Sequence, residues 1–183
     1  MKFGVFGSAA GEMKDTAKAG ARAIGRRIAQ TGNVVVTGGC RGLPYEAVLG
    51  ANELHGKCIA FSPAVDLGDH IEVYNFPTTG FSEYVFVPRD YANVKNTDAC
   101  KKYRNVNSVA YVDAAIIIGG RIGTMNEFTI AYDLGKKIGI LGGSGGITSE
   151  AIRILLRDAA KESKAKIRWN DCPEPLVDSL IEL

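Results

Sequence analysis

A buried-type strand, a glycine turn and a helix follow one another at Asp113–Glu127, where the sequence reads DAAIIIGGRIGTMNE. Gly119, Gly120 and Gly123 allow the backbone to turn tightly and to approach a ligand. The N-terminus of the helix directs free N–H groups and the positive end of its dipole towards an anion, and Thr124 adds a hydroxyl group. The pattern predicts a phosphate-binding turn, although the same glycines would also suit a tight turn that binds nothing.

Glu127 lies one turn into the same helix, near the opening of the glycine turn. A carboxylate at this place can stabilise positive charge on a bound sugar ring and orient a water molecule for attack. The alternative is a structural one, in which Glu127 only caps or decorates the helix. The sequence therefore makes Glu127 a candidate catalytic residue.

Glycine pairs or runs follow four apolar segments. They are Gly7-Ser8, Gly38-Gly39, Gly119 to Gly123 and Gly142 to Gly146. Ligands of open α/β sheets bind outside the carboxyl ends of the strands, so we expect these turns to converge on one crevice that binds a nucleotide or a sugar phosphate. The first turn reads GVFGSAAG and lacks the G-x-G-x-x-G fingerprint, which disfavours NAD and FAD.

Strand and helix patterns alternate along the chain on either side of these turns, which predicts a single α/β domain over residues 1–183 with a mostly parallel sheet. The residues from His70 to Val87 are expected to form a long loop with one short strand, Tyr84 to Val87. The expected strands are otherwise Lys2 to Phe6, Asn33 to Thr37, Lys57 to Ser62, Ala114 to Ile118, Lys137 to Leu141 and an edge strand at Lys166 to Trp169. The expected helices are Asp15 to Thr31, Tyr45 to His55, Ala92 to Val112 as one helix or a broken one, a helix ending at Leu134, Thr148 to Lys161 and Pro173 to Leu183.

Composition narrows the classes of function. The chain has 183 residues, is 46% hydrophobic and carries a formal net charge of +2, so no strong field favours nucleic acid as a partner. The basic stretch Lys161 to Arg168 is interpreted as a solvated helix surface. Without a signal-peptide pattern or an apolar run of about eighteen residues, a cytoplasmic protein that does not bind membranes is expected.

Metal binding is not predicted. Four cysteines lie far apart with no C-x-x-C pair, and they are expected to be free thiols: Cys40, Cys58, Cys100 and Cys172. Cys40, inside a glycine turn, either contacts a ligand or fills a tight space. His55 and His70 show no ligand spacing. His55 is expected at a helix end, and His70 is only a weak candidate for the pocket.

These motifs resemble a family that contains the LONELY GUY phosphoribohydrolases, often mislabelled lysine decarboxylases, and the molybdenum cofactor carrier proteins. The family pattern P-G-G-x-G-T-x-x-E falls on Gly119 to Glu127, and its preceding arginine falls on Arg104. Arg104-Asn105, the N-terminal GVFGS and the TGGCRGLPYEA turn resemble the carrier branch most. The resemblance covers most of the chain and implies a Rossmann-like three-layer sandwich and a homo-oligomer.

Two departures from the family pattern lie in the glycine turn. Gly119 replaces the family proline, and Arg121 replaces the second glycine of the pair. A side chain at position 121 would be strained if the backbone there required a positive φ. Arg121 either contacts a phosphate, narrows the pocket or points into solvent.

The resemblance implies two functions that differ in turnover. In the first, the chain binds a nucleotide-like phosphorylated ligand, a nucleotide or a molybdenum cofactor, without converting it and with no required cofactor. In the second, it cleaves the N-glycosidic bond of a nucleoside 5′-monophosphate, with Glu127 at the ribose and Arg104 near the leaving base. Arg104 could instead only form an ion pair with Asp113 or Glu127. Whether the chain is an enzyme stays open at this point, but lysine decarboxylation is disfavoured because no Schiff-base lysine with its cofactor pocket is visible.

In either function, the phosphate is expected on backbone N–H groups from Gly120 to Thr124, with Ser8 and Gly39 on the opposite wall. Glu46, on the helix after the second glycine turn, is a secondary candidate for a ribose hydroxyl. A glutamate favoured by the helix dipole would explain it equally well.

Overall fold

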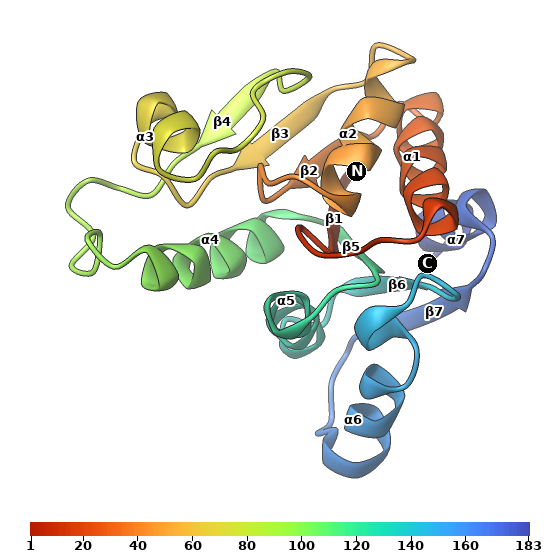
Figure 1. Cartoon of the computed structure of the whole chain (residues 1–183). Coiled ribbons are helices and arrows are strands. Elements are labelled where there is room, and N and C mark those ends of the chain that lie inside the picture. The colour runs from red at the N-terminus through yellow and green to blue at the C-terminus, as the bar shows by residue number, and fades with distance from the viewer.

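The computed structural model describes residues 1–183 as one seven-stranded sheet with helices on both faces (Figure 1). The strand order is β4-β3-β2-β1-β5-β6-β7, and every neighbouring pair is parallel. The strands are β1 (Lys2–Gly7), β2 (Val34–Thr37), β3 (Cys58–Phe61), β4 (Glu83–Val85), β5 (Ala114–Ile118), β6 (Lys137–Leu141) and β7 (Lys166–Asn170). The helices are α1 (Asp15–Gln30), α2 (Leu43–Asn52), α3 (Leu67–Glu72), α4 (Thr97–Tyr111), α5 (Ile122–Asp133), α6 (Ala151–Ala159) and α7 (Pro173–Ile181), with a short 3-10 turn at Gly146–Thr148. This is the Rossmann-like three-layer α/β sandwich that the sequence predicts.

Two hydrophobic clusters fill the spaces between the sheet and its helix layers. One lies under α1, α2 and α7, and the other under α4, α5 and α6 (Figure 1). Strand β5 serves both, because alternate residues of a strand face opposite sides of the sheet: Ile116 and Ile118 join the first cluster, and Ala115 and Ile117 the second. A central strand buried on both faces must be apolar throughout, which explains the uninterrupted sequence AAIII.

The chain reverses its direction across the sheet between β1 and β5. From β1 it adds β2, β3 and β4 on one side, and α4 then carries it back to β5 on the other side of β1. Such a reversal places the loops after the two adjacent strands on opposite faces and opens a crevice between them. The loops after β1 and β5 are the turns Gly7-Ser8 and Gly119 to Gly123, so the topology brings two predicted glycine clusters together.

The segment before β4 differs from the expected loop, because a short helix, α3, begins at Leu67. Its signal is Asp66, whose carboxylate accepts a hydrogen bond from Asp69 N at 3.0 Å and so caps the first turn. Helix α4 begins later than expected for the same kind of reason, since the Asn96 side chain accepts hydrogen bonds from Asp98 N and Ala99 N. Side-chain caps, rather than apolar spacing, set both boundaries.

The C-terminal third departs from expectation at one helix. The predicted helix Thr148 to Lys161 is shorter in the structure, because the 3-10 turn ends at Thr148 and α6 begins at Ala151 and ends at Ala159. The interpretation of the basic stretch Lys161 to Arg168 as a helix surface is therefore wrong. The stretch forms a loop and the start of edge strand β7, and its basic side chains are exposed. No helix of the chain is long and apolar enough to cross a bilayer.

Candidate functional site

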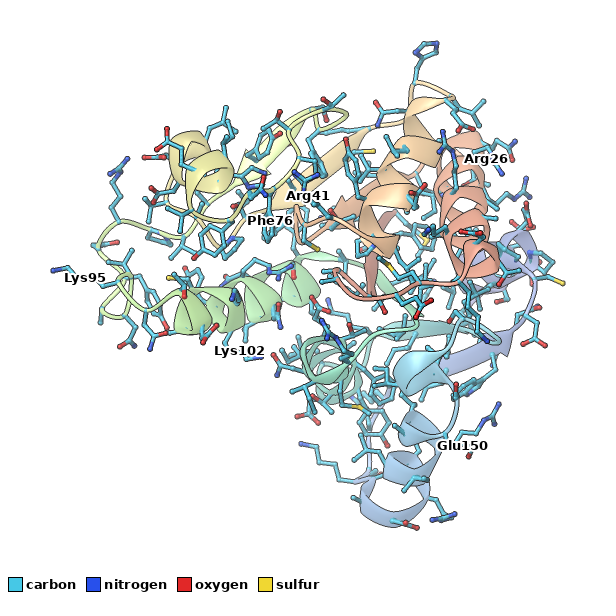
Figure 2. The ribbon with its side chains drawn as sticks, in the orientation of Figure 1. Arg26, Arg41, Phe76, Lys95, Lys102 and Glu150 are labelled. Carbon is cyan, nitrogen blue, oxygen red and sulfur yellow. The ribbon has the colours of Figure 1, made fainter.

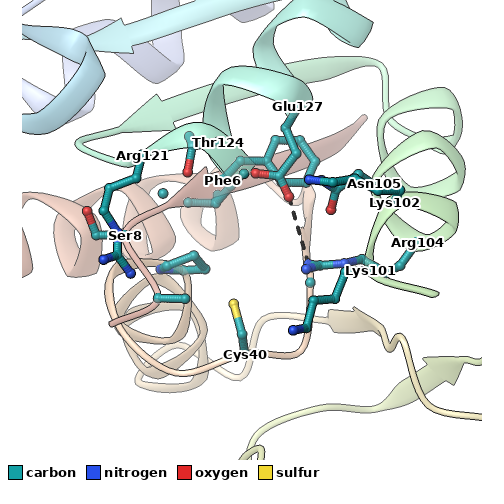
Figure 3. Close-up of a pocket in the computed structure, with 16 residues that line it drawn as sticks. Phe6, Ser8, Cys40, Lys101, Lys102, Arg104, Asn105, Arg121, Thr124 and Glu127 are labelled. Atoms are coloured by element: carbon teal, nitrogen blue, oxygen red, sulfur yellow. Dashed lines mark ion pairs between the residues drawn. The ribbon is translucent and has the colours of Figure 1, made fainter. Parts of the chain in front are cut away.

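A cavity of about 170 Å³ opens at the carboxyl ends of β1, β2 and β5, between α4 and the start of α5. The loop after β1, the turn after β2, helix α4 and helix α5 each contribute to its walls (Figure 3). Its polar lining residues are Ser8, Cys40, Lys101, Lys102, Arg104, Asn105, Arg121, Thr124 and Glu127. The cavity thus lies at the reversal point of the sheet, where ligands of this fold class bind.

Backbone contacts that only glycine permits hold the loops around the cavity. A Cβ atom on Gly7 would lie 2.3 Å from the carbonyl oxygen of Ile118, and one on Gly42 would lie 2.2 Å from that of Ser8. The Ser8 hydroxyl accepts a hydrogen bond from Gly120 N at 2.8 Å. The loop after β1 is thereby fixed directly to the glycine turn after β5.

The glycine turn after β5 places its left-handed residues before Arg121 rather than at it. Gly119 and Gly120 have φ values of 57° and 91°, whereas Arg121 has φ −131° and ψ −153°, an extended conformation open to any residue. The strain considered for a side chain at position 121 is therefore absent. Arg121 is exposed and lines the cavity (Figure 3).

Helix α5 points its N-terminus at this opening. The first N–H groups of any helix lack an intrahelical acceptor, and Arg121, the residue before α5, provides no side-chain cap. Gly123 and Thr124 line the cavity within this first turn. The start of α5 therefore presents donors and a positive dipole end to the cavity.

Arg104 and Glu127 meet across the cavity from α4 and α5. Arg104 Nη1 lies 3.8 Å from Glu127 Oε1, and both side chains are about nine-tenths buried (Figure 3). The guanidinium rests on the turn after β2, since a Cβ atom on Gly38 would lie only 1.3 Å from Arg104 Nη1. The ion pair considered for Arg104 forms with Glu127, and Asp113 instead accepts a hydrogen bond from Lys2 N at 2.7 Å.

Burial changes the acid strength of two groups in the cavity. It raises the pKa of Glu127 to about 7, an effect that Arg104 and, less strongly, Lys102 oppose. It also raises the pKa of the Cys40 thiol, against the opposing effect of Arg104. Glu127 can therefore gain or lose a proton near neutral pH, whereas Cys40 remains a thiol, as expected for a free cysteine.

Positive charge dominates the cavity. Lys101, Lys102, Arg104 and Arg121 line it, and Glu127 is its only acidic residue. Lys101 and Lys102 were not predicted as site residues. Lys101 could have been found, because Lys101, Arg104 and Asn105 follow the i, i+3, i+4 spacing that places residues on one face of a helix. Asn105 was noted only as part of a resemblance.

Three predicted ligand-binding residues lie elsewhere. Gly39 and Gly120 belong to the two turns but not to the cavity lining. Glu46 faces α1, where its carboxylate lies 3.5 Å from Arg22 Nη1. The dipole and this ion pair account for a glutamate at the start of α2 without a ligand.

The fourth glycine cluster, Gly142 to Gly146, does not line this cavity but supports its wall from behind. The Ser144 hydroxyl accepts a hydrogen bond from Gly119 N at 2.9 Å, and Ile147 N donates to the Gly120 carbonyl at 3.1 Å. A second cavity of about 330 Å³ lies between this cluster and the loop after β1. It shares Ser8 and Arg121 with the first, so Arg121 stands between the two.

His70 is buried outside the cavity. Its Nε2 lies 3.1 Å from the Pro77 carbonyl and its Nδ1 lies 2.8 Å from the Ser62 hydroxyl. The neighbouring Phe76 lies beside Arg41, which donates a hydrogen bond to the Asn75 carbonyl (Figure 2). These contacts attach the α3–β4 segment to the turn after β2, so His70 has a structural role.

Comparison with known proteins relates the chain to one family. The model of the SLOG cluster4 family matches residues 1–174. An uncharacterised protein of Archaeoglobus fulgidus is 29% identical over 141 residues, which cover 77% of this chain and 80% of that protein.

Solved structures of similar fold include proteins with different ligands. The protein TM1055 matches all of this chain and 99% of its own with a TM-score of 0.79 at 22% identity. A molybdenum cofactor binding protein from Rippkaea orientalis matches 98% of this chain and 96% of its own, with a TM-score of 0.71 at 21% identity. DNA processing protein A from Helicobacter pylori, which binds single-stranded DNA, matches all of this chain and 80% of its own, with a TM-score of 0.67 at 20% identity. These likenesses support the fold, and they leave the predicted absence of a nucleic acid partner untested.

Proposed function

Because the chain belongs to the SLOG cluster4 family, we propose that its cavity binds a nucleotide-like phosphorylated ligand, such as a nucleotide or a molybdopterin-type cofactor. The observation that carries this proposal is the charge of the cavity, which has four cationic side chains and one carboxyl group. Cations gathered in a cleft with low-dielectric walls attract an anion more strongly than the same charges dispersed in water.

The phosphate is assigned to the mouth of the cavity, between Arg121 and the N-terminus of α5. Thr124 contributes a hydroxyl there, and the first N–H groups of α5 provide donors that tolerate any phosphate ester. Lys101 and Lys102 on the opposite rim add charge without fixed geometry. The lining includes Ser8, as expected, but not Gly39. Gly120 N, which was expected at the phosphate, donates a hydrogen bond to the Ser8 hydroxyl instead.

The size of the cavity sets how much of the ligand is enclosed. A volume of about 170 Å³ is below the roughly 300–1,000 Å³ of sites that enclose a drug-sized molecule. A phosphate and the adjoining sugar or ring fit inside, and a larger ligand extends past Arg121 towards the second cavity. A molybdenum cofactor is included as a candidate cargo because a protein of similar fold is named for binding it.

A second candidate function is hydrolysis of a nucleoside 5′-monophosphate to free base and ribose 5-phosphate. The pair Arg104–Glu127 favours it, since a carboxyl group with a pKa of about 7 is suited to proton transfer at neutral pH. Ionised Glu127 would take a proton from water as the water oxygen bonds to the anomeric carbon. The C–N bond would break as Arg104 stabilises negative charge on the departing base.

Binding is tested first by isothermal titration of the purified protein with AMP, GMP, CMP, UMP and a molybdopterin preparation. We expect at least one ligand to bind. The substitution Arg104→Gln should lower the affinity for that ligand about 30-fold, because it removes a buried charge worth about 2 kcal/mol of binding free energy. Arg157→Gln is the matched control, because Arg157 is an exposed arginine on α6 that pairs with Asp158. Equal effects of the two variants, or no binding by the wild type, would contradict the proposal.

Turnover is tested by following free base chromatographically with the same nucleotides. Base release that disappears in Glu127→Gln would establish the hydrolase. Binding without base release would establish a carrier or sensor. A homo-oligomer and a cytoplasmic location stay predictions, which sedimentation and fractionation can check.

A further inference from the structure

Two buried polar atoms of the protein have no hydrogen-bond partner within it: Arg104 Nε and Asn105 Oδ1. They belong to successive residues of α4, and both residues line the cavity. Asn105 is 3% exposed. A buried acceptor without a donor destabilises the folded protein, and natural proteins leave few of them.

The other end of the same amide group is fixed. Asn105 Nδ2 donates a hydrogen bond to Asn126 Oδ1 at 3.0 Å, and Asn126 precedes Glu127 on α5. This contact orients the amide so that its donor side faces α5, and its buried, unpartnered oxygen points towards the cavity (Figure 3). The ligand-facing group of Asn105 is therefore an acceptor whose direction is set by a second residue.

Glu127 places another acceptor beside it. The two side chains lie next to each other on the cavity wall (Figure 3), and the nearest cation to the carboxylate, Arg104 Nη1, is 3.8 Å away, beyond hydrogen-bond distance. A ligand group there can donate hydrogen bonds to Asn105 Oδ1 and to the ionised Glu127 carboxylate. Arg104 and the two lysines would repel a ligand ammonium group. A ligand carboxylate would face two other acceptors, Asn105 Oδ1 and the Glu127 carboxylate. Neutral hydroxyl groups therefore fit best.

We infer that Asn105 is a specificity-determining residue that accepts a hydrogen bond from a ligand hydroxyl group, so that this pocket selects phosphorylated polyhydroxy compounds such as sugar phosphates and nucleotides that contain them. The inference rests on the proposed function, because it concerns the part of the ligand next to the phosphate. Beyond the proposed function, it assigns Asn105 to the site, makes its amide oxygen the hydrogen-bond acceptor and narrows the ligands to phosphorylated polyhydroxy compounds.

The test compares ribose 5-phosphate with inorganic phosphate by isothermal titration, and uses the ratio of their affinities so that changes in overall charge cancel. In the wild type, ribose 5-phosphate should bind at least tenfold more tightly than phosphate. Asn105→Ala should lower this ratio about tenfold, as expected for the loss of a buried hydrogen bond, while the affinity for phosphate stays the same.

Substitutions of Asn126 test the direction of the amide without altering Asn105. Asn126→Asp keeps an acceptor for Asn105 Nδ2 and should leave the ratio unchanged. Asn126→Ala frees the amide to rotate and should lower the ratio about threefold. If Asn126→Asp lowers the ratio instead, Asn105 presents its nitrogen to the ligand and the inference is wrong.

The remaining outcomes separate this inference from the proposed function. If the wild type binds phosphate and ribose 5-phosphate equally, or if Asn105→Ala changes both affinities alike, the hydroxyl contact is refuted while anion binding stands. If the wild type binds neither, the proposed function fails and the inference fails with it. Thermal melting of each variant shows whether a lost affinity reflects a lost fold.

Discussion

The glycine turns after β5 and β6 are alike in sequence and differ in what their polar groups contact. In the turn after β6, the Ser144 hydroxyl contacts Gly119 N, the Leu141 carbonyl and Thr148, and the Thr148 hydroxyl donates to the Gly145 carbonyl. In the turn after β5, the N-terminus of α5 has no side-chain cap, and unpartnered Arg104 Nε and Asn105 Oδ1 lie in the adjoining wall.

The difference shows that glycine at the end of a strand indicates a close approach of backbones, not by itself a ligand. The turn after β6 uses that freedom to pack against the turn after β5. A Cβ atom on Gly146 would lie 2.3 Å from the Gly120 carbonyl oxygen. What distinguishes the turn that we propose to bind a ligand is the set of polar groups that its neighbours leave unsatisfied. Four substitutions test this difference between the two turns.

The largest effect is expected on stability from Gly146→Ala. Its new methyl group would meet the Gly120 carbonyl at a residue with φ 57°, and overpacking together with a left-handed non-glycine residue costs about 3 kcal/mol. Gly143→Ala is the matched control: φ is 66° and no atom lies within 4 Å of its Cβ, so a loss of about 1 kcal/mol is expected. Urea denaturation measures both, and equal losses would show that the two turns are not held together here.

Glu127→Gln should make stability depend less on pH. The folded protein holds the Glu127 proton more tightly than the unfolded chain, since the pKa is about 7 against an ordinary 4.5. The contribution of Glu127 to the free energy of unfolding is therefore fully present below pH 4.5 and is lost as the pH rises to about 7. The difference corresponds to roughly 3 kcal/mol, so Glu127→Gln should be more stable than the wild type at pH 8 and similar at pH 4. Denaturation curves at both values check this, and a variant less stable at pH 8 would indicate that the ion pair with Arg104 outweighs burial.

Gly38→Ala should act on binding rather than on the fold. Its methyl group would occupy the position of the Arg104 guanidinium, whose Nη1 lies 1.3 Å from that Cβ. Displacing a buried arginine from the site should lower the binding affinity for AMP or ribose 5-phosphate about 30-fold, or by about 2 kcal/mol. The melting temperature should change little, because the end of the arginine side chain can move. Titration calorimetry is the measurement, and Gly143→Ala should bind as the wild type does. Unchanged binding in Gly38→Ala would remove Arg104 from the site.

The smallest effect is expected from Arg121→Gln. Arg121 is exposed, so its contribution to anion binding should be about 0.5–1 kcal/mol, a two- to fivefold change in affinity, and should diminish at high salt. Titrations at 50 mM and 500 mM sodium chloride measure it. A larger loss that persists in salt would instead indicate a direct two-point contact with the phosphate.

The sequence predicted most of the sheet, because strands buried on both faces are marked by uninterrupted apolar runs. Ala114–Ile118 and Lys137–Leu141 were predicted with the bounds that the structure shows. Helix boundaries were less predictable where a side-chain cap, as at Asn96 before α4, decided them. Helices α1 and α2 were both predicted, but the packing of α2 against α1, which brings Glu46 to Arg22, could not be predicted from the sequence.

The fold class and the candidates Thr124 and Glu127 could be derived from the sequence alone, because apolar periodicity and glycine spacing are local properties of the chain, whereas Arg104 was identified through the resemblance to a known family. The folded structure was needed to show which glycine turns meet, that Lys101, Lys102 and Asn105 line the same cavity as Glu127, and that Asn105 Oδ1 is left without a donor. Hydrogen-bond satisfaction and burial depend on atoms distant in the sequence, and the same burial raises the pKa of Glu127 to about 7.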